Sequence, residues 1–290
     1  MRIPSNRVRD IERYYLAELR DLYPEEELHT FVYMLFEAFL GWDRTHFLLH
    51  RDDTINQSDL LRFHWAAEDL KQYRPIQHII GHTDFCGLRI NVNPDVLIPR
   101  PETEEIVTQL LQRPLFAPAS ILDLCTGSGC IAIALKHHLP QAAVTAVDLS
   151  PSALAVAQDN SRLNNTDINF RQLDILNPLQ LASLNSSYDL IISNPPYVME
   201  RERADMQPNV LNYDPPQALF VPDSDPLLFY RAIAQFAATH LHPDGLLVVE
   251  INQALAPQTA QLFQDKGFNA VIHNDFRSNP RHISATLSRP

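Results

Sequence analysis

The segment Ile121-Leu-Asp-Leu-Cys-Thr-Gly-Ser-Gly-Cys-Ile131 is the most informative part of this chain for its fold. Its first four residues predict a short buried strand, and the residues from Ile131 to Leu139 predict a helix. Two glycines, Gly127 and Gly129, stand between them in a chain with only 7 glycines among 290 residues. Glycines in such a turn let the backbone approach a ligand closely, and the first N–H groups of the helix are free to bind it. The stretch therefore predicts a ligand-binding loop of an α/β sheet.

The residues that follow continue the alternation of strand and helix. Further apolar strands are predicted at 144–147, 168–173, 188–193 and 246–251, and helices at 152–163, 227–240 and 256–266. Two last strands are predicted at 268–273 and 282–287. Repeated βα units with short apolar strands indicate a doubly wound, mostly parallel, Rossmann-like sheet.

The residues before this region predict a different architecture. Pro24 followed by three glutamates is typical of a helix start, and Gly41 of a helix end. A further helix from Ser58 has Leu60, Leu61, Trp65 and Leu70 as its expected apolar face. Residues 83–98 then show a strand-turn-strand pattern. We expect an N-terminal helical domain for substrate recognition over 1–80, a linking β-hairpin over 81–99 and a catalytic α/β domain over 100–290.

Composition limits the classes of function. The net charge is −12, and no Lys/Arg stripe marks a surface for a nucleic-acid backbone. The three cysteines form no CxxC pair, and no apolar run approaches the length of a membrane span. The histidine pairs His46/His50 and His78/His82 have no clear third ligand nearby, so no metal site is expected. We expect a cytoplasmic monomer without membrane or direct nucleic-acid partners.

Two acidic residues follow predicted strands on the side of the glycine loop. Asp148 ends the second strand, where a carboxylate can accept both hydroxyls of a ribose. Asp174 follows the third strand and can meet an adenine amino group. Gly127, Gly129 and Ala132 also satisfy the pattern of dinucleotide-binding loops. The loop alone therefore does not separate NAD from S-adenosylmethionine.

The tetrapeptide Asn194-Pro195-Pro196-Tyr197 follows the fourth predicted strand of the sheet. The Asn194 side-chain oxygen and the Pro195 carbonyl can accept the two N–H groups of a planar NH₂ group. Two prolines stiffen the loop, and Tyr197 can stack on a flat amide or base. An amide nitrogen held in this way, in line with a sulfonium methyl group, can be methylated through proximity and orientation. The tetrapeptide therefore favours an N-methyltransferase.

These motifs together resemble the release-factor glutamine methyltransferases, the PrmC/HemK family of protein-(glutamine-N5) methyltransferases. The resemblance runs from about Arg74 to Leu287 and includes Phe85-x-Gly87, the glycine loop and the tetrapeptide. Its most specific part is the segment Val96-Leu-Ile-Pro-Arg-Pro-Glu-Thr-Glu104. The resemblance implies a class I methyltransferase fold and a substrate glutamine in the Gly-Gly-Gln motif of class I peptide-chain release factors. The implied products are N5-methylglutamine and S-adenosylhomocysteine.

The resemblance also implies site residues. The glutamine amide would be bound by the tetrapeptide, with Asn194, Pro195 and Tyr197 as the catalytic residues. Arg100 and Glu102 would line the site near the methionine end of the cofactor. The residues expected around S-adenosylmethionine are Cys125, Thr126, Gly127, Ser128, Gly129, Asp148, Asp174, Ile175 and Asn194.

Three alternative functions stay open from the residues. The same chemistry could methylate a glutamine of a ribosomal protein. Because the tetrapeptide suits any planar amino group, it could also methylate adenine N6 in a nucleic acid, against which the acidic charge counts. A module that binds S-adenosylmethionine without catalysis is the third, and the intact tetrapeptide beside the intact loop counts against it.

Overall fold

The computed structural model describes residue 3 and residues 5–114, 117–184 and 187–288 of the chain. The chain folds into two compact units. One comprises Met1–Gly81 with Gln207–Tyr213, and the other comprises His82–Met206 with Asp214–Pro290. The first unit thus includes a short segment from far along the chain. None of the helices in the described part of the chain has both the length and the hydropathy needed to span a bilayer.

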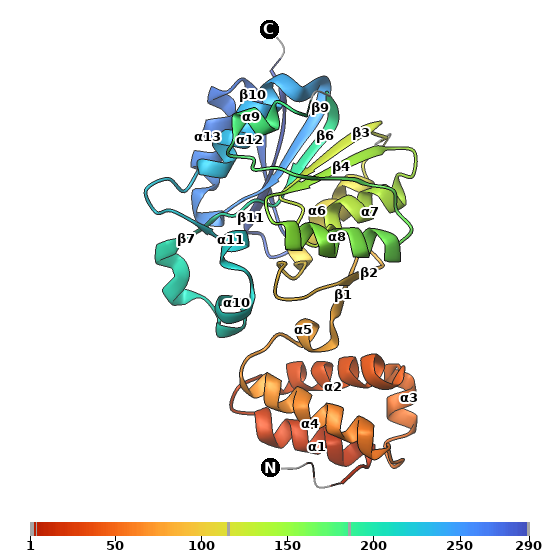
Figure 1. Ribbon diagram of the computed structural model, residues 1–290. Coiled ribbons are helices and arrows are strands. Elements are labelled where there is room, and N and C mark those ends of the chain that lie inside the picture. Colours follow the sequence, from red (N-terminus) through yellow and green to blue (C-terminus); the bar gives the residue numbers. More distant parts are fainter. Residues whose placement is uncertain (1–2, 4, 115–116, 185–186, 289–290) are drawn as a thin grey trace. The chain divides into compact units, whose positions relative to one another are not determined.

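The first unit consists of helices (Figure 1), as expected. They are α1 (Val8–Leu19), α2 (Glu25–Leu40), α3 (Arg44–Leu49), α4 (Gln57–Lys71), α5 (Ile76–Ile80) and the inserted α10 (Pro208–Tyr213). The predicted signals around α2 are confirmed, because three glutamates occupy its first turn. Gly41, at φ 70°, ends it by donating its N–H to the Glu37 carbonyl oxygen.

The apolar face predicted for α4 is partly wrong. Leu61 and Trp65 are 53% and 60% exposed. The buried stripe of α4 is instead formed by Phe63, Ala66, Ala67 and Leu70. Both stripes have helical spacing, and the two alanines make the difference, because small side chains let a helix pack closely on its neighbours. Large apolar side chains alone therefore indicated the wrong stripe.

A two-stranded antiparallel hairpin opens the second unit, formed by β1 (His82–Phe85) and β2 (Leu88–Asn91). Cys86 and Gly87 are its two turn residues, and both have positive φ, at 51° and 75°. Positive φ at both turn positions matches the right-handed twist of the two strands. The predicted hairpin is therefore confirmed, but it is shorter than expected, since residues 92–98 contain no strand.

The core of the second unit is a seven-stranded sheet (Figure 1) in the order β10-β11-β9-β6-β3-β4-β5. Its strands are β3 (Ser120–Leu124), β4 (Ala143–Asp148), β5 (Asn169–Gln172), β6 (Tyr188–Ser193), β9 (Leu241–Glu250), β10 (Phe268–Asn274) and β11 (Pro280–Leu287). Neighbouring strands from β9 to β5 are parallel, and β11 is antiparallel to both β9 and β10. The predicted mostly parallel sheet is confirmed.

Helices cover both faces of this sheet (Figure 1). They are α6 (Pro101–Leu111), α7 (Cys130–His138), α8 (Pro151–Leu163), α9 (Pro178–Leu181), α12 (Leu228–His240) and α13 (Ala256–Asp265). In β6, Leu190 and Ile192 pack in the core cluster with α6 and α7, whereas Ile191 packs in the cluster with α12 and α13. Because successive side chains of a strand point to opposite faces of the sheet, this single apolar strand contributes to the hydrophobic cores on both faces.

One excursion leaves this layered pattern between β6 and α12. It contains the short parallel pair β7 (Val198–Met199) and β8 (Phe220–Val221), a 3₁₀ helix at Glu200–Asp205 and α11 (Pro216–Leu219). A second 3₁₀ helix, Gln253–Leu255, follows β9.

The order of the strands reverses within the sheet, because the chain runs outward from β3 to β5 and then returns to β6 on the other side of β3. Ligands of open α/β sheets bind at such a reversal, beyond the carboxyl ends of the strands.

Candidate active site

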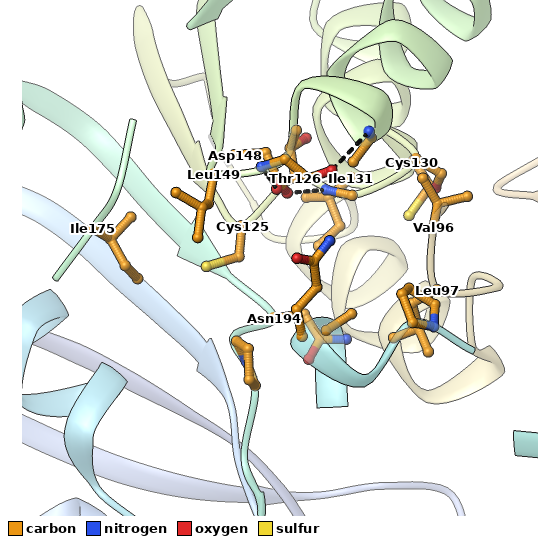
Figure 2. A pocket seen from close by; sticks show the side chains of 18 of the residues that line it. Val96, Leu97, Cys125, Thr126, Cys130, Ile131, Asp148, Leu149, Ile175 and Asn194 are labelled. Carbon is orange, nitrogen blue, oxygen red and sulfur yellow. Dashed lines mark hydrogen bonds between the residues drawn. The ribbon is translucent and has the colours of Figure 1, made fainter. Parts of the chain in front are cut away.

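A pocket lies at this reversal of strand order, within the second unit (Figure 2). Its lining comes from the ends of β3, β4, β5 and β6, the loop before α6, and the residues around α11. Figure 2 shows Cys125, Asp148, Leu149 and Asn194 around the same hollow. The pocket therefore brings together the glycine loop, the acid after β4 and the first residue of the tetrapeptide.

The glycine loop turns sharply between β3 and α7. Cys125, Gly127 and Gly129 have positive φ values of 61°, 54° and 82°. Gly127 has open space where a Cβ would lie, whereas a Cβ on Gly129 would come within 3.0 Å of Ala157. The first glycine thus leaves room on the pocket side, and the second permits close packing of α8. Of the five predicted loop residues, all but Gly129 line the pocket.

Asp148 ties the loop to the end of β4. Its Oδ2 accepts the Gly127 N–H at 2.8 Å, and its Oδ1 accepts the Ser150 N–H at 2.9 Å. Burial raises the pKa of this carboxyl group, and the backbone donors oppose the rise. The carboxylate lines the pocket with free lone pairs, so it can accept hydroxyl groups from a ligand.

The residues after β5 complete the far wall. Asp174 and Ile175 line the pocket as predicted, and the Asp174 Oδ1 accepts the Leu176 N–H at 2.9 Å. Leu149 and Leu176 also line it, with exposed fractions of 57% and 36%. Neither leucine was predicted as a site residue. Their signal in the sequence was an apolar residue soon after each strand-end acid, because Leu149 directly follows Asp148 and Leu176 stands two residues after Asp174.

Arg100, the N-cap residue of α6, and Glu102, in the first turn of α6, are placed differently. Arg100 lines the pocket and forms an ion pair with the buried Asp214. Burial raises the pKa of Asp214, and the charge of Arg100 opposes that rise. Glu102 does not line the pocket, whereas Thr103, one residue further, does. The structure therefore brings Arg100 but not Glu102 to the site.

The tetrapeptide follows β6 directly. Asn194 and Pro196 line the pocket, whereas Pro195, also predicted as a site residue, does not. The Asn194 Nδ2 donates a hydrogen bond to the Thr103 Oγ1 at 3.1 Å. Tyr197 is not among the pocket-lining residues, and its ring packs against the core on the α12 side of the sheet. The structure thus turns the first and last residues of the tetrapeptide in different directions.

The hydroxyl group of Tyr197 donates to Glu250, the last residue of β9, at 2.9 Å between Oη and Oε1. Thr103 donates its hydroxyl to the other carboxylate oxygen, Oε2, at 2.6 Å. Glu250 is 3% exposed, and burial raises its pKa. Neither Thr103 nor Glu250 was predicted as a site residue from the sequence. They are 147 residues apart, and no local pattern pairs them.

Cysteine and histidine side chains add no metal centre in the described ranges. No group of three or more His, Cys, Asp or Glu side chains there has a geometry suited to an ion. His46 and His50 stack at 4.1 Å between ring centroids, and His50 contacts Asp53. Burial raises the pKa of Cys130 to about 12, which keeps its thiol protonated and unreactive.

Family models match both parts of the chain. The model of the methyltransferase small domain matches residues 103–213, and the model of the PrmC N-terminal domain matches residues 11–81. The first match contains the glycine loop, Asp148 and the tetrapeptide. The second covers the helices that precede the hairpin.

Curated relatives match almost the whole chain. The chain is 41% identical to a release factor glutamine methyltransferase of Flavobacterium psychrophilum, over 97% of this chain and 99% of the relative. It is 39% identical to the protein of the same name from Bacteroides thetaiotaomicron, over 95% and 98%. A third, from Geobacter sulfurreducens, is 37% identical over 90% and 89%.

Solved structures agree on the fold. A methyltransferase from Pyrococcus furiosus matches with a TM-score of 0.51 and 18% identity, over 70% of this chain and 90% of that chain. A 16S rRNA methyltransferase from T. thermophilus, solved with AdoMet and guanosine, matches with a TM-score of 0.50 and 16% identity. That match covers 72% of this chain and 50% of the other. The second unit therefore has the class I methyltransferase fold.

Proposed function

The chain belongs to the family of release factor glutamine methyltransferases, and on that premise we propose that it methylates the Gly-Gly-Gln glutamine of class I peptide-chain release factors. The methyl group would pass from S-adenosylmethionine to the N5 atom of the side-chain amide. S-adenosylhomocysteine would leave, and the amide nitrogen would lose one proton after the transfer. One observation carries this proposal beyond family membership. Asn194, the first residue of an amide-binding tetrapeptide, lines the same pocket as the glycine loop and Asp148.

The pocket fits S-adenosylmethionine in three respects. The positive φ and open space at Gly127 leave a backbone cradle beside the helix start. Asp148 offers a carboxylate to ribose hydroxyls, and Leu149, Ile175 and Leu176 offer apolar surface to a flat base. Cys125, Thr126, Ser128 and Asp174 complete the proposed contacts, and Gly129 shapes the loop. When bound, this cofactor supplies a methyl group on a positively charged sulfur, a charge that an acidic site tolerates.

The chain's own residues would act on the amide. The Asn194 side-chain oxygen and the Pro195 carbonyl each accept one N–H of the substrate NH₂ group, which holds the nitrogen and increases its electron density. Pro195 and Pro196 lack N–H donors and have fixed φ angles, so the loop is rigid and the direction of the Pro195 carbonyl is fixed. Arg100 at the pocket wall would orient the neighbouring substrate backbone. Tyr197 and Glu102 would support the site from outside the pocket lining.

Charge and setting favour a protein substrate over a nucleic acid. The net charge of −12 would repel a phosphate backbone. The T. thermophilus rRNA methyltransferase shares only the fold, so it does not argue for a nucleic-acid substrate here. We propose that the helical unit grips the release factor and that the enzyme works as a monomer in the cytoplasm, where translation terminates. A ribosomal-protein glutamine is the second candidate, because the same clamp would serve it.

Methyl transfer from labelled S-adenosylmethionine to four acceptors tests the proposal. The acceptors are a class I release factor, the same factor with its Gly-Gly-Gln glutamine changed to alanine, ribosomal protein and duplex DNA. We expect label on the first acceptor alone. Equal label on both release factors would disprove the target glutamine, and label on ribosomal protein or DNA alone would replace the substrate.

A further inference from the structure

We propose that Glu250 is a positioning residue that, through Thr103, fixes which atom of the Asn194 side chain faces the substrate amide. This inference rests on the proposed function, because it assigns a task to residues around the amide-binding tetrapeptide. Neither Glu250 nor Thr103 needs to touch the substrate amide in this role. Their task is to decide the direction of the hydrogen bonds that end at Asn194.

The observation is a continuous chain of hydrogen bonds. Asn194 Nδ2 donates to Thr103 Oγ1 at 3.1 Å, and Thr103 Oγ1 donates to Glu250 Oε2 at 2.6 Å. Tyr197 donates its hydroxyl to Glu250 Oε1 at 2.9 Å. Both ends of the tetrapeptide are thereby linked to one carboxylate. The three bonds join helix α6, strand β9 and the loop after β6, which are far apart in sequence.

The direction of this chain follows from donor and acceptor chemistry. An ionised carboxylate can only accept hydrogen bonds, so the Thr103 hydroxyl must donate its single hydrogen to Glu250. Thr103 can then only accept from Asn194, which requires the NH₂ side of the Asn194 amide. The Asn194 carbonyl oxygen is consequently left for the ligand. The proposed mechanism needs that oxygen, because a substrate NH₂ group brings donors and no acceptor.

Without this constraint the Asn194 amide has two nearly isosteric orientations. A neighbouring hydroxyl alone serves either, since it can donate or accept. The reversed orientation would set the Asn194 NH₂ against the substrate NH₂, donor against donor. A buried acceptor-only group at the far end of the chain removes that ambiguity, and Glu250 supplies it.

The position of Glu250 costs stability. Burial raises its pKa, while Thr103, Tyr197 and the charge of Arg281 lower it and Glu102 raises it further. A carboxyl group whose pKa is raised by folding destabilises the folded state when it is ionised. Arg281 is held by Asp275 through two hydrogen bonds, at 3.1 and 3.0 Å, and does not neutralise Glu250 by direct contact. A costly buried acid next to a ligand pocket is typical of a functional role.

The same end of β9 holds the tetrapeptide by its backbone as well. Asn252 Nδ2 donates to the Tyr197 carbonyl oxygen at 3.1 Å and to Glu202 Oε2 at 3.0 Å. Glu202 therefore holds the same Asn252 side chain that holds the Tyr197 backbone. Tyr197 is fixed at its hydroxyl by Glu250 and at its carbonyl by Asn252.

Four variants test the proposal on the full-length enzyme with release factor as substrate. Thr103→Val removes the hydroxyl at nearly constant volume, and Thr103→Ser retains it. Glu250→Gln keeps the shape but can accept from only one of its two hydroxyl partners. Thr259→Val is the matched control, because Thr259 is fully buried in α13 and donates to the Leu255 carbonyl away from the site.

We expect Thr103→Val to lower kcat about 100-fold, which is typical for the loss of one group that orients a reacting amide. Thr103→Ser should recover most of that loss, and Glu250→Gln should lower kcat about 10-fold. The Kd for S-adenosylmethionine should stay within about 2-fold of wild type in all four variants, and Thr259→Val should leave kcat unchanged. Glu250→Gln should stay folded, because glutamine keeps the shape of the side chain and one of its two acceptor oxygens.

The opposite results would overturn the proposal. Full turnover by Thr103→Val, or equal loss in Thr103→Ser and Thr103→Val, would show that the hydroxyl does not set the orientation of Asn194. Full turnover by Glu250→Gln would show that the carboxylate has no role in turnover. Unfolding of Glu250→Gln would show that its role is structural. If the wild-type enzyme itself does not methylate the release factor, the proposed function fails, and that failure is read from the wild-type reaction alone.

Discussion

The cofactor pocket and the tetrapeptide are held in different ways. The glycine loop is set by its own backbone N–H groups and residues 21 positions away, because Thr126 donates its N–H to Val147 and Gly127 to Asp148. The tetrapeptide is set by side chains 53 to 147 residues apart, through Thr103 and Glu250. On the proposed function, cofactor binding would depend on backbone shape, whereas selection of the amide would depend on a few side-chain hydrogen bonds.

The largest expected effect is a loss of turnover with little change in cofactor affinity, and it comes from Asn194 in the tetrapeptide. Asn194→Ala should lower kcat by about 1000-fold, because the substrate amide loses its side-chain acceptor at the reacting nitrogen. The Kd for S-adenosylmethionine, measured by calorimetry, should change by less than about 3-fold, since the loop and Asp148 are untouched. Turnover within 10-fold of wild type would rule out the amide clamp.

Replacement of Asp148 should have the opposite pattern, with a loss of cofactor affinity and a smaller change in turnover. Asp148→Ala should weaken S-adenosylmethionine binding about 30-fold, as expected when a charged acceptor is lost to hydroxyl groups. At saturating cofactor, kcat should fall far less than in Asn194→Ala. Calorimetry and kinetics on the same preparation check both values. Unchanged affinity would mean that Asp148 does not bind the cofactor.

Two glycine variants test how backbone conformation and packing hold the glycine loop. Gly129→Ala should lower the free energy of unfolding by about 2–3 kcal/mol, because it combines positive φ with a Cβ 3.0 Å from Ala157 and Ile133. Gly127→Ala should cost about 1 kcal/mol, because it has positive φ but open space. Denaturant unfolding without cofactor measures both. Equal losses would show that packing against α8 contributes nothing.

A further expected effect concerns β11, the strand beside Glu250. His282, its register partner on β11, stacks on His273 of β10 at 4.6 Å. Burial and the charge of His273 lower the pKa of His282 from 6.5 to about 4, and burial and Arg113 lower that of His273. The folded state thus resists a proton that the unfolded state takes up. Stability should be full above pH 6.5 and decline from there towards pH 4.

Thermal unfolding across this window checks the expectation, with a decrease in Tm of about 5 °C at its acidic end. A His282→Gln variant, which does not titrate, should lose part of that dependence. The same decline in wild type and variant would assign the acid sensitivity to other groups.

Much of this architecture could be predicted from the sequence because it follows from local chemistry. Short apolar strands and the glycine loop fixed the sheet, and β6 was predicted with its observed bounds, Tyr188–Ser193. The acid at the end of β4 followed from its position after a strand. Leu61 and Trp65 were misplaced because two stripes of α4 have helical spacing, and only tertiary packing selects between them.

The parts that could not be predicted depend on residues that meet only in three dimensions. Glu250 ends an apolar strand, and Thr103 lies in a helix, and each looks ordinary alone. Their pairing needs the register of β9 beside β6 and the packing of α6 over the sheet. The irregular excursion from Val198 to Val221 had no periodic signal, so its short elements were not anticipated.

The assignment of Gln207–Tyr213 to the helical unit has a consequence for recombination between relatives. The helical unit is encoded in two separate pieces, and Tyr213 joins them by donating its hydroxyl to the Gln72 carbonyl oxygen at 2.9 Å. Asp214, the next residue, already belongs to the second unit and forms an ion pair with Arg100, which lines the pocket. A crossover that exchanges residues 1–81 alone would therefore bring a foreign surface to α10, one peptide bond away from the active site. Productive chimaeras must carry both pieces from the same parent.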